Sequence, residues 1–459
     1  MEQINFDKIL KLIKSTDAEN KKIRLLSNKL IKIINETAKD HKICAEAVLV
    51  GSVAKDTWLS GKADIDIFIK FPLSIDENDL KKNGMFLGHE CIKKVRGIAE
   101  ERYSTHPYVT GLIEEYEVDF VPCYVIEDSK QLKSAVDRTI LHTEYVKKNL
   151  KTDKTDEVLL LKKFMESIGT YGSEFKVGGF SGYLCELLII YYGSFLEVLK
   201  AASEKWHPEY IIDIEKQQTG KFFDGSLVVV DPVDEKRNVA AALTLQRMSE
   251  FVVASRNFLE NPSEEYFFPE IPRLNVDFIK NEFEKRGTKT HLLVFAPPKV
   301  PSDAIHSQLK KTENSLKSIV KKEDFRVFGS DSWTDENKIA IILLEFDIWK
   351  LPIIKKHIGP YVWSKHHQRR FLKKYKKKTW IDGDRWVVEV ERKYRDIESF
   401  FYNILREGEV DHLKFGKHIK TEILKHHVDI GEFLGSKKCN DAVLMFLYKY
   451  LNKNKDLWR

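Results

Sequence analysis

The segment LVGSVAKDTWLSGKADIDIFIKF, residues 49–71, sets two carboxylates inside an apolar strand. An apolar run ends in a Gly-Ser turn, and Asp64 and Asp66 then stand one residue apart in a second apolar run. Side chains two residues apart on a strand point to the same face, so these carboxylates share a face while Ile65 and Ile67 point into the core. A carboxylate buried in a sheet costs free energy unless it is paired or holds a cation. The segment therefore predicts two strands joined by a turn, with a cation site on the second.

A third carboxylate, Asp119, interrupts the apolar run YEVDFVPCY further along the chain. If its strand lies beside that of Asp64 and Asp66, three hard oxygen donors meet at one point, and such donors suit Mg²⁺ better than zinc. Two such ions, about 3.5–4 Å apart, can activate an attacking hydroxyl and neutralise a leaving phosphate. Alternatively, the aspartate pair keeps an edge strand soluble and Asp119 forms a buried ion pair. The order of strand, Gly-Ser turn, short helix and two aspartate-bearing strands favours the metal site.

The Gly-Ser turn predicts a phosphate contact. Gly51 and Ser52 end a strand and open a short helix, which presents backbone N–H groups and a hydroxyl to a triphosphate. Lys55 follows one helical step further on. A Gly-Ser pair taken alone is an ordinary turn, so this prediction depends on the aspartates beside it.

The composition is that of a globular protein with roughly two to four domains, because 459 residues exceed what one compact core holds. The net charge of +6 is only mildly basic, which permits a polyanionic partner without demanding one. The five cysteines are odd in number and contain no C-x-x-C pair, which argues against a disulfide framework or a zinc site and fits a reducing cytoplasm. The N-terminus carries no signal-type apolar core, and Glu186 and Glu197 interrupt the most apolar segment. We expect a cytoplasmic protein with no membrane segment.

The periodicity of apolar residues divides the chain into three parts. The first third alternates helices and strands, with one helical stretch expected over residues 77–101. Residues 157–255 are mostly helical, and a proline-rich loop over residues 259–275 looks like a boundary. Beyond it, a strand-helix-strand-strand order is typical of half a ferredoxin-like sandwich. We expect an α+β protein.

Three strings in the middle of the chain are longer and more specific: SAVDRT from residue 134, GFSGYLCELL from residue 179 and DPVDEKRNVAAAL from residue 231. In the third, Pro232 predicts a turn, and Asp234 is expected to cap a helix that begins EKRN. Arg237 is then either a solvated arginine in the first helical turn or a planar fork aimed at a phosphate or a base edge.

With these motifs the chain resembles the DNA polymerase beta nucleotidyltransferase superfamily and, within it, the archaeal class I CCA-adding tRNA nucleotidyltransferases. The resemblance implies a polymerase-beta-like nucleotidyltransferase head over residues 1–146 and a helical neck that binds nucleotide and primer over residues 147–270. A C-terminal body and tail that bind tRNA would follow over residues 271–459. It implies template-independent addition of C, C and A to the tRNA 3′ end from CTP and ATP, with two Mg²⁺ ions and release of pyrophosphate. It leaves open whether the protein forms a homodimer.

The resemblance also assigns site residues. Asp64, Asp66 and Asp119 would be the catalytic metal ligands, with Asp119 nearest the primer hydroxyl. Arg237 would select the base, and His106 would lie near the tRNA end or the nucleotide sugar. The triphosphate would be met by Gly51, Ser52, Lys55, Thr139, His142, Lys162 and Tyr171.

Each of these assignments has a structural alternative. His142 could be a surface histidine, Tyr171 a core aromatic, and Lys162 a solvated neighbour of Lys163. Two positions also depart from the family pattern. Asp64 stands where related enzymes can carry the longer glutamate, and Lys55 replaces an arginine fork with a point charge.

A basic segment near the C-terminal third, SKHHQRRFLKKYKKKTW, predicts contact with the phosphate backbone of RNA. Such a charge run is otherwise a solvated surface. The resemblance implies that this part grips the acceptor stem and upper half of tRNA by its A-form shape. The predicted RNA contacts are Lys365, Arg369, Arg370, Lys373, Lys374 and Lys376.

Two other functions remain open at this point. Another enzyme of the superfamily, poly(A)-adding or oligoadenylate synthetase-like, would share the carboxylates and make a homopolymer. A tRNA-binding protein with a silent catalytic site would bind without incorporating nucleotides, which the complete carboxylate set argues against.

Overall fold

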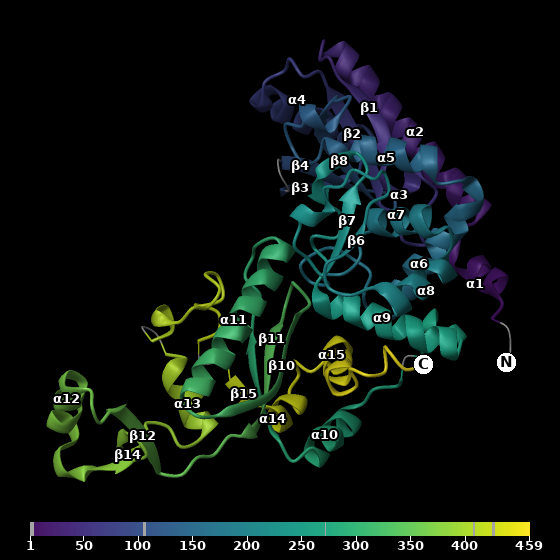
Figure 1. The fold of residues 1–459 in the computed structure, drawn as a ribbon. Coiled ribbons are helices and arrows are strands. Elements are labelled where there is room, and N and C mark those ends of the chain that lie inside the picture. The colour runs from purple at the N-terminus through teal and green to yellow at the C-terminus, as the bar shows by residue number, and fades with distance from the viewer. Residues whose placement is uncertain (1–3, 104–106, 271, 407–408, 425–426) are drawn as a thin grey trace. The chain divides into compact units, whose positions relative to one another are not determined.

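The computed structural model describes residues 4–103, 107–270, 272–406, 409–424 and 427–459, and its fold is α+β. The chain divides into two compact units (Figure 1). Unit 1 comprises Met1–Ile271 together with Asn454–Arg459, and unit 2 comprises Pro272–Lys453.

Unit 1 begins with a five-stranded sheet in the order β1-β2-β5-β4-β3. β2 runs antiparallel to β1 and parallel to β5. Helices α2 and α4 lie alongside the sheet in Figure 1, and their apolar residues share one core with Ile65, Ile67 and Ile69 of β2. The elements of this part are α1 (Phe6–Ile13), α2 (Asp17–Asp40), β1 (Glu46–Val50), α3 (Gly51–Ala54), β2 (Ile65–Phe71), α4 (Glu77–Lys94), β3 (Ile98–Tyr103), β4 (Pro107–Ile113) and β5 (Tyr116–Tyr124).

Capping residues explain where the two long helices begin. The Thr16 hydroxyl accepts a hydrogen bond from the backbone N–H of Glu19, and the Asp76 carboxylate accepts from two N–H groups of the first turn of α4. The expected helix over residues 77–101 is wrong at its C-terminal end, because α4 stops at Lys94 and residues from Ile98 form β3. A Cβ on Gly97 would lie 2.9 Å from the Ile113 side chain and 3.0 Å from the Leu112 carbonyl oxygen, so the chain passes close to β4 just before β3 begins.

The rest of unit 1 is mainly helical around one large aromatic-rich core. The predicted helix at Asp234 is wrong, because residues 234–238 form β8, which pairs back onto β7 as a hairpin. All five residues of β7 are buried, four of them apolar, and Pro232 follows the strand directly. The elements are α5 (Arg138–Asn149), α6 (Thr155–Ser167), α7 (Gly182–Tyr192), α8 (Phe195–Lys205), β6 (Tyr210–Ile212), β7 (Leu227–Asp231), β8 (Asp234–Asn238) and α9 (Leu245–Glu260).

The last residues of the chain pack within unit 1. The Leu457 carbonyl accepts hydrogen bonds from Asn257 (2.8 Å) and from the Tyr266 hydroxyl (2.8 Å). The Arg459 guanidinium donates to the hydroxyl of Ser167 at 2.7 Å and to its carbonyl at 3.0 Å.

Among the described residues no single helix is long and apolar enough to cross a membrane, although α7 and α8, bent by 90° from each other, pass that length and composition test as a pair.

Unit 2 contains a four-stranded sheet in the order β10-β11-β9-β15 and a three-stranded sheet in the order β12-β14-β13. The sequence β9, α11, β10, β11 has the expected strand-helix-strand-strand order, with β11 between the other two strands. The elements are α10 (Val276–Lys285), β9 (Lys289–Phe295), α11 (Ser302–Lys322), β10 (Arg326–Thr334), β11 (Ala340–Ile348), β12 (Ile354–Tyr361), α12 (Lys365–Tyr375), β13 (Thr379–Asp382), β14 (Arg385–Glu391), α13 (Ile397–Ile404), β15 (His427–Asp429), α14 (Ile430–Leu434) and α15 (Asp441–Leu451).

Candidate active site

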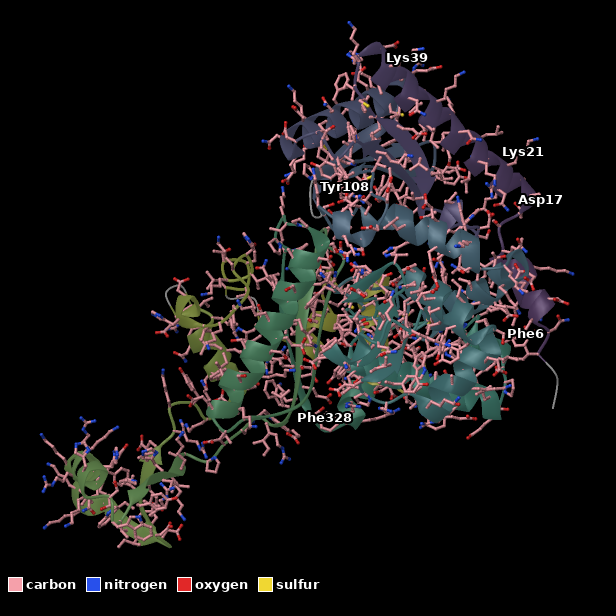
Figure 2. The ribbon with its side chains drawn as sticks, turned by 45° about the horizontal axis from the view of Figure 1, so that its top comes forward. Phe6, Asp17, Lys21, Lys39, Tyr108 and Phe328 are labelled. Carbon is pink, nitrogen blue, oxygen red and sulfur yellow. The ribbon has the colours of Figure 1, made fainter. Side chains whose placement is uncertain are left out.

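Two of the three predicted carboxylates face each other across neighbouring strands. β2 and β5 pair in parallel with Asp66 directly opposite Asp119, and Asp64 lies one residue before β2. The Thr110 hydroxyl on β4 donates a 2.5 Å hydrogen bond to Asp119 Oδ1. Tyr108, labelled in Figure 2, stands two residues before Thr110 on the same strand. Strand pairing therefore brings the predicted residues to one face of the sheet.

Burial and mutual repulsion make this face strongly attractive to cations. Burial, followed by the charges of Asp119 and Asp64, raises the pKa of Asp66 to about 7. Burial and the neighbouring Glu117 raise the pKa of Asp64, and burial also raises that of Asp119. A cation would remove the repulsion that raises these pKa values.

The Gly51 turn lies against Asp66. Gly51 has φ +73°, and a Cβ built on it would lie 1.9 Å from Asp66 Oδ2. No residue with a side chain can occupy this position while Asp66 keeps its place. The turn backbone therefore lies directly against the Asp66 carboxylate.

The donor chemistry of the three carboxylates fits hard divalent cations, which take oxygen ligands. Within the described ranges, no three His, Cys, Asp or Glu side chains form a ready-made cage for a metal ion. Magnesium usually keeps waters and substrate phosphates among its ligands, so one or two carboxylates for each ion suffice.

Lys55 and Lys162 converge on a buried glutamate that the sequence analysis did not assign. Glu186 of α7 is buried and lies 2.5 Å from Lys55 Nζ and 3.7 Å from Lys162 Nζ. The Thr57 hydroxyl donates to Glu186, and Lys162 donates to the Thr57 carbonyl at 2.6 Å. Burial opposes ionisation of Glu186, but the charges of the two lysines lower its pKa. Lys162 is thus not the solvated lysine of the structural alternative.

A second buried carboxylate, Asp231 at the end of β7, contacts both Arg237, the predicted base-selecting residue, and His142, a predicted triphosphate contact. Its Oδ2 lies 2.9 Å from His142 Nε2 and accepts from Arg237 Nη1 at 2.7 Å. Its Oδ1 accepts from the Tyr183 hydroxyl at 3.2 Å and from the Val233 N–H at 3.2 Å. Burial opposes its ionisation, but His142 and Arg237 lower the pKa of Asp231.

The remaining nucleotide candidates lie on nearby elements. Thr139 is in the first turn of α5, one turn before His142. Tyr171 is partly buried, and burial, followed by the electrostatic effects of Cys185, Glu186 and Asp64, raises its pKa. Its hydroxyl borders Gly182 at the start of α7, beside Lys162 Nζ.

The predicted RNA contacts divide in two. His106 lies outside the described residues. The six basic residues are all exposed, five on α12 and Lys376 directly after it, and in the described part of the chain none is within ion-pair distance of a carboxylate. The interleaved rings differ, since Phe371 packs inward against His357 and Gly359 whereas Trp380 is exposed.

Sequence reasoning missed Glu186, Asp231, Tyr183 and Thr110. Glu186 and Asp231 carried a signal, because each is a carboxylate within a strongly apolar run, as Asp119 is. A carboxylate in an apolar run predicts a buried charge that needs a partner. It does not say which residue that partner is, because the partner lies far away in the sequence.

The sheet, the facing aspartates and the glycine turn define a nucleotidyltransferase, and residues 29–142 match the family model described as nucleotidyltransferase domain. Residues 156–268 match "tRNA nucleotidyltransferase, second domain", and residues 286–431 match "CCA-adding enzyme, C-terminal domain".

Curated relatives cover nearly the whole chain. A CCA-adding enzyme of Methanothermobacter thermautotrophicus is 50% identical over 99% of each chain. One of Pyrococcus abyssi is 37% identical over 97% of this chain and 98% of its own. The chain therefore belongs to the CCA-adding enzyme family, which confirms the resemblance predicted from the sequence.

Among solved structures, a cytoplasmic RNA terminal U-transferase is similar with a TM-score of 0.45 and 17% identity, over 58% of this chain and 98% of that chain.

Proposed function

We propose that this enzyme adds C, C and A in order to the 3′ end of tRNA, using CTP and ATP and releasing pyrophosphate. The terminal ribose hydroxyl attacks the α-phosphate of the incoming nucleotide. The observation that carries the proposal is the pairing of Asp66 with Asp119, with the Gly51 backbone against Asp66.

Asp64, Asp66 and Asp119 would hold two Mg²⁺ ions. When bound, such ions would lower the pKa of the attacking ribose hydroxyl and neutralise negative charge on the triphosphate. Thr110 fixes the Asp119 carboxylate by its 2.5 Å hydrogen bond, so this side chain keeps one orientation. Asp119 remains our candidate for the group nearest the primer hydroxyl.

The turn and the lysines would receive the triphosphate. The Gly51 and Ser52 backbone and the Lys55 charge stand beside Asp66, whose pKa Lys55 helps to lower. Thr139, Lys162 and Tyr171 remain proposed contacts. Arg237, which donates to Asp231, would help to select the base, and His142, which the same carboxylate contacts, remains a proposed contact of the triphosphate.

The tRNA would be bound through its acceptor stem and upper half. The exposed cations of α12, free of ion pairs within the described residues, support this assignment, because unpaired lysines and arginines are available for phosphates. We retain the division into head, neck and C-terminal parts at residues 146 and 270 as part of the proposal.

The test is incubation of the protein with tRNA that lacks its 3′ CCA, Mg²⁺ and labelled CTP or ATP, with products resolved to one nucleotide. Wild type should add two C and one A, and Asp66→Ala and Asp66→Asn should add none at unchanged tRNA affinity. Asp40→Ala removes an exposed carboxylate at the end of α2 and should behave as wild type.

Other products would overturn the proposal. Long A tails would assign the chain a poly(A)-adding reaction. Binding of tRNA without incorporation would assign a silent site, and incorporation that survives Asp66→Ala would remove the carboxylates from the chemistry.

A further inference from the structure

A fourth carboxylate, Glu117, stands on the same face of the five-stranded sheet as the predicted metal ligands. Glu117 precedes Asp119 by two residues on β5, so both side chains point to the same face. β5 pairs in parallel with β2, with Val118 opposite Ile65, and Glu117 and Asp64 directly precede that pair. After burial, the charge of Glu117 does most to raise the pKa of Asp64. Glu117 therefore lies beside the predicted ligands.

One arginine distinguishes Glu117 from the other three carboxylates. Arg102 on β3 pairs with Tyr108 on β4, and its guanidinium reaches over β4 to donate through Nη1 to Glu117 on β5. Its Nε and Nη2 donate to Glu100 Oε2 at 3.3 and 3.1 Å. In the described part of the chain, the three predicted metal ligands form no ion pair with a lysine or arginine. Only Glu117 is thus neutralised by a side chain.

Arg102 also acts on the ligands themselves. Burial and the charge of Glu117 raise the pKa of Asp64 and of Asp119, whereas Arg102 lowers both. The Arg102 side chain is 37% exposed and that of Glu117 is 49% exposed. An ion pair this exposed adds little to folding stability. Its effect on the charge of the metal face is direct.

The number of free carboxylates on this face matters because Mg²⁺ keeps waters and substrate phosphates among its ligands. A fourth free carboxylate would add a negative charge and a hard oxygen donor beside Asp64. It would strengthen ion binding in the absence of nucleotide, and it would compete with triphosphate oxygens for the remaining coordination positions. The pairing with Arg102 withholds Glu117 from that role.

We propose that Arg102 is a positioning residue that withholds Glu117 from the metal face, so that three carboxylates hold the ions and positions stay open for the triphosphate. This inference rests on the proposed function, since it concerns the ions of that reaction. Arg102 acts through Glu117 and needs no contact with substrate.

The first experiment titrates the protein with Mn²⁺ alone and follows free Mn²⁺ by electron paramagnetic resonance, at about pH 8 so that protons do not compete for the carboxylates. Arg102→Gln removes the cation and frees Glu117, so this variant should bind Mn²⁺ at least about threefold more tightly than wild type. In C addition the same variant should show a KM for CTP raised by a similar factor, with kcat changed less.

The decisive variant adds Glu117→Gln to Arg102→Gln. This double variant lacks both charges, so its Mn²⁺ affinity and its KM for CTP should return to the wild-type values. A purely structural role predicts no such return, because removing the second partner restores no contact. Both side chains are more than a third exposed, so we expect all three variants to fold.

Arg247→Gln is the matched control. Arg247 also pairs with a glutamate, Glu250 at 2.6 Å, and its side chain is 32% exposed. It lies on α9, away from the five-stranded sheet in Figure 1. This variant should keep the wild-type Mn²⁺ affinity and KM. Asp66→Asn should weaken Mn²⁺ binding, which shows that the titration reports the candidate metal face.

The outcomes are distinguishable. If wild type adds C, C and A but Arg102→Gln leaves the Mn²⁺ affinity unchanged, the inference fails and the proposed function stands. The same holds if the double variant does not return to the wild-type affinity. If wild type adds no nucleotide, the proposed function fails and the inference fails with it.

Discussion

At Gly51 the backbone has φ +73°, and the position its Cβ would take is already filled by the Asp66 carboxylate. Gly61 has the same φ of +73° and nothing within 4 Å of a Cβ position. The two glycines therefore share the cost of a left-handed conformation and differ only in what a methyl group would meet.

Gly51→Ala should lower the single-turnover rate of C addition at least about a hundredfold, because displacing Asp66 by about an ångström misaligns the site. Gly61→Ala should keep its activity. In urea unfolding, Gly61→Ala should lose about 1–2 kcal/mol of stability for its left-handed backbone, and Gly51→Ala should lose more, because its methyl group also meets the Asp66 carboxylate. Equal activity of the two variants would show that the Gly51 contact does not matter for the reaction.

Glu186 is one carboxylate shared by two buried ammonium groups. Glu186→Gln should lower the free energy of unfolding by about 3 kcal/mol or more, since it strands two buried positive charges. Glu197→Gln is the control, because Glu197 pairs with Lys200 with both side chains 52% exposed. That change should cost under about 0.5 kcal/mol. Similar unfolding midpoints for the two variants would contradict this account.

At the scale of elements, strand β2 and its aspartates could be predicted because alternation on a half-buried strand is a local signal. The end of α4 and the hairpin β7–β8 could not, because sheet partners far away in the sequence decide them. Asp64, Asp66, Asp119 and Gly51 could be proposed as site residues from local pattern for the same reason. Asp231 and Glu186 were missed because their partners are brought together by the fold.

The basic residues of α12 and Lys376 should determine how strongly tRNA affinity depends on salt concentration. Changing Lys373, Lys374 and Lys376 to Gln should weaken tRNA binding and make log K less steep against log[salt] by up to about three units, one for each lost phosphate contact. The matched change of Lys21, Lys29 and Lys39, exposed lysines on α2, should leave the slope as in wild type. Lys21 and Lys39 are labelled in Figure 2. The slope can be measured by filter binding at salt concentrations from about 50 to about 200 mM. If the slope of the α12 variant equals that of wild type, α12 is not part of the RNA interface.

At the scale of the molecule, unit 2 carries a buried histidine that opposes folding in acid. His291 on β9 is 2% exposed, its ring nitrogens make no hydrogen bond among the described residues, and Glu398 Oε1 is 3.5 Å from Nε2. Burial lowers its pKa to about 4. The unfolded chain binds this proton near pH 6.5, so stability is complete above that pH and is lost as the pH falls toward 4.

Unit 2 of wild type should therefore lose about 2 kcal/mol from this residue between pH 7.5 and pH 5. Comparing wild type with His291→Gln isolates the contribution of His291. The variant should lack this part of the pH dependence, whereas the other groups titrate in both proteins. His418→Gln, at an exposed position, should follow wild type. Parallel curves for wild type and His291→Gln in urea unfolding would show that His291 takes up no proton on unfolding.

Residues 454–459 belong to unit 1, so unit 2 is inserted into the sequence of unit 1. The chain therefore passes between the two units twice. A protease that cuts the loop before Val276 breaks one of these connections and leaves the other. The cut gives two polypeptide fragments, and the C-terminal fragment carries both unit 2 and residues 454–459. Because Leu457 and Arg459 in that fragment hydrogen-bond to unit 1, we expect the two fragments to stay associated without a covalent link in native buffer. A band pattern on a denaturing gel can therefore report cleavage of this chain well before size-exclusion chromatography reports any loss of mass.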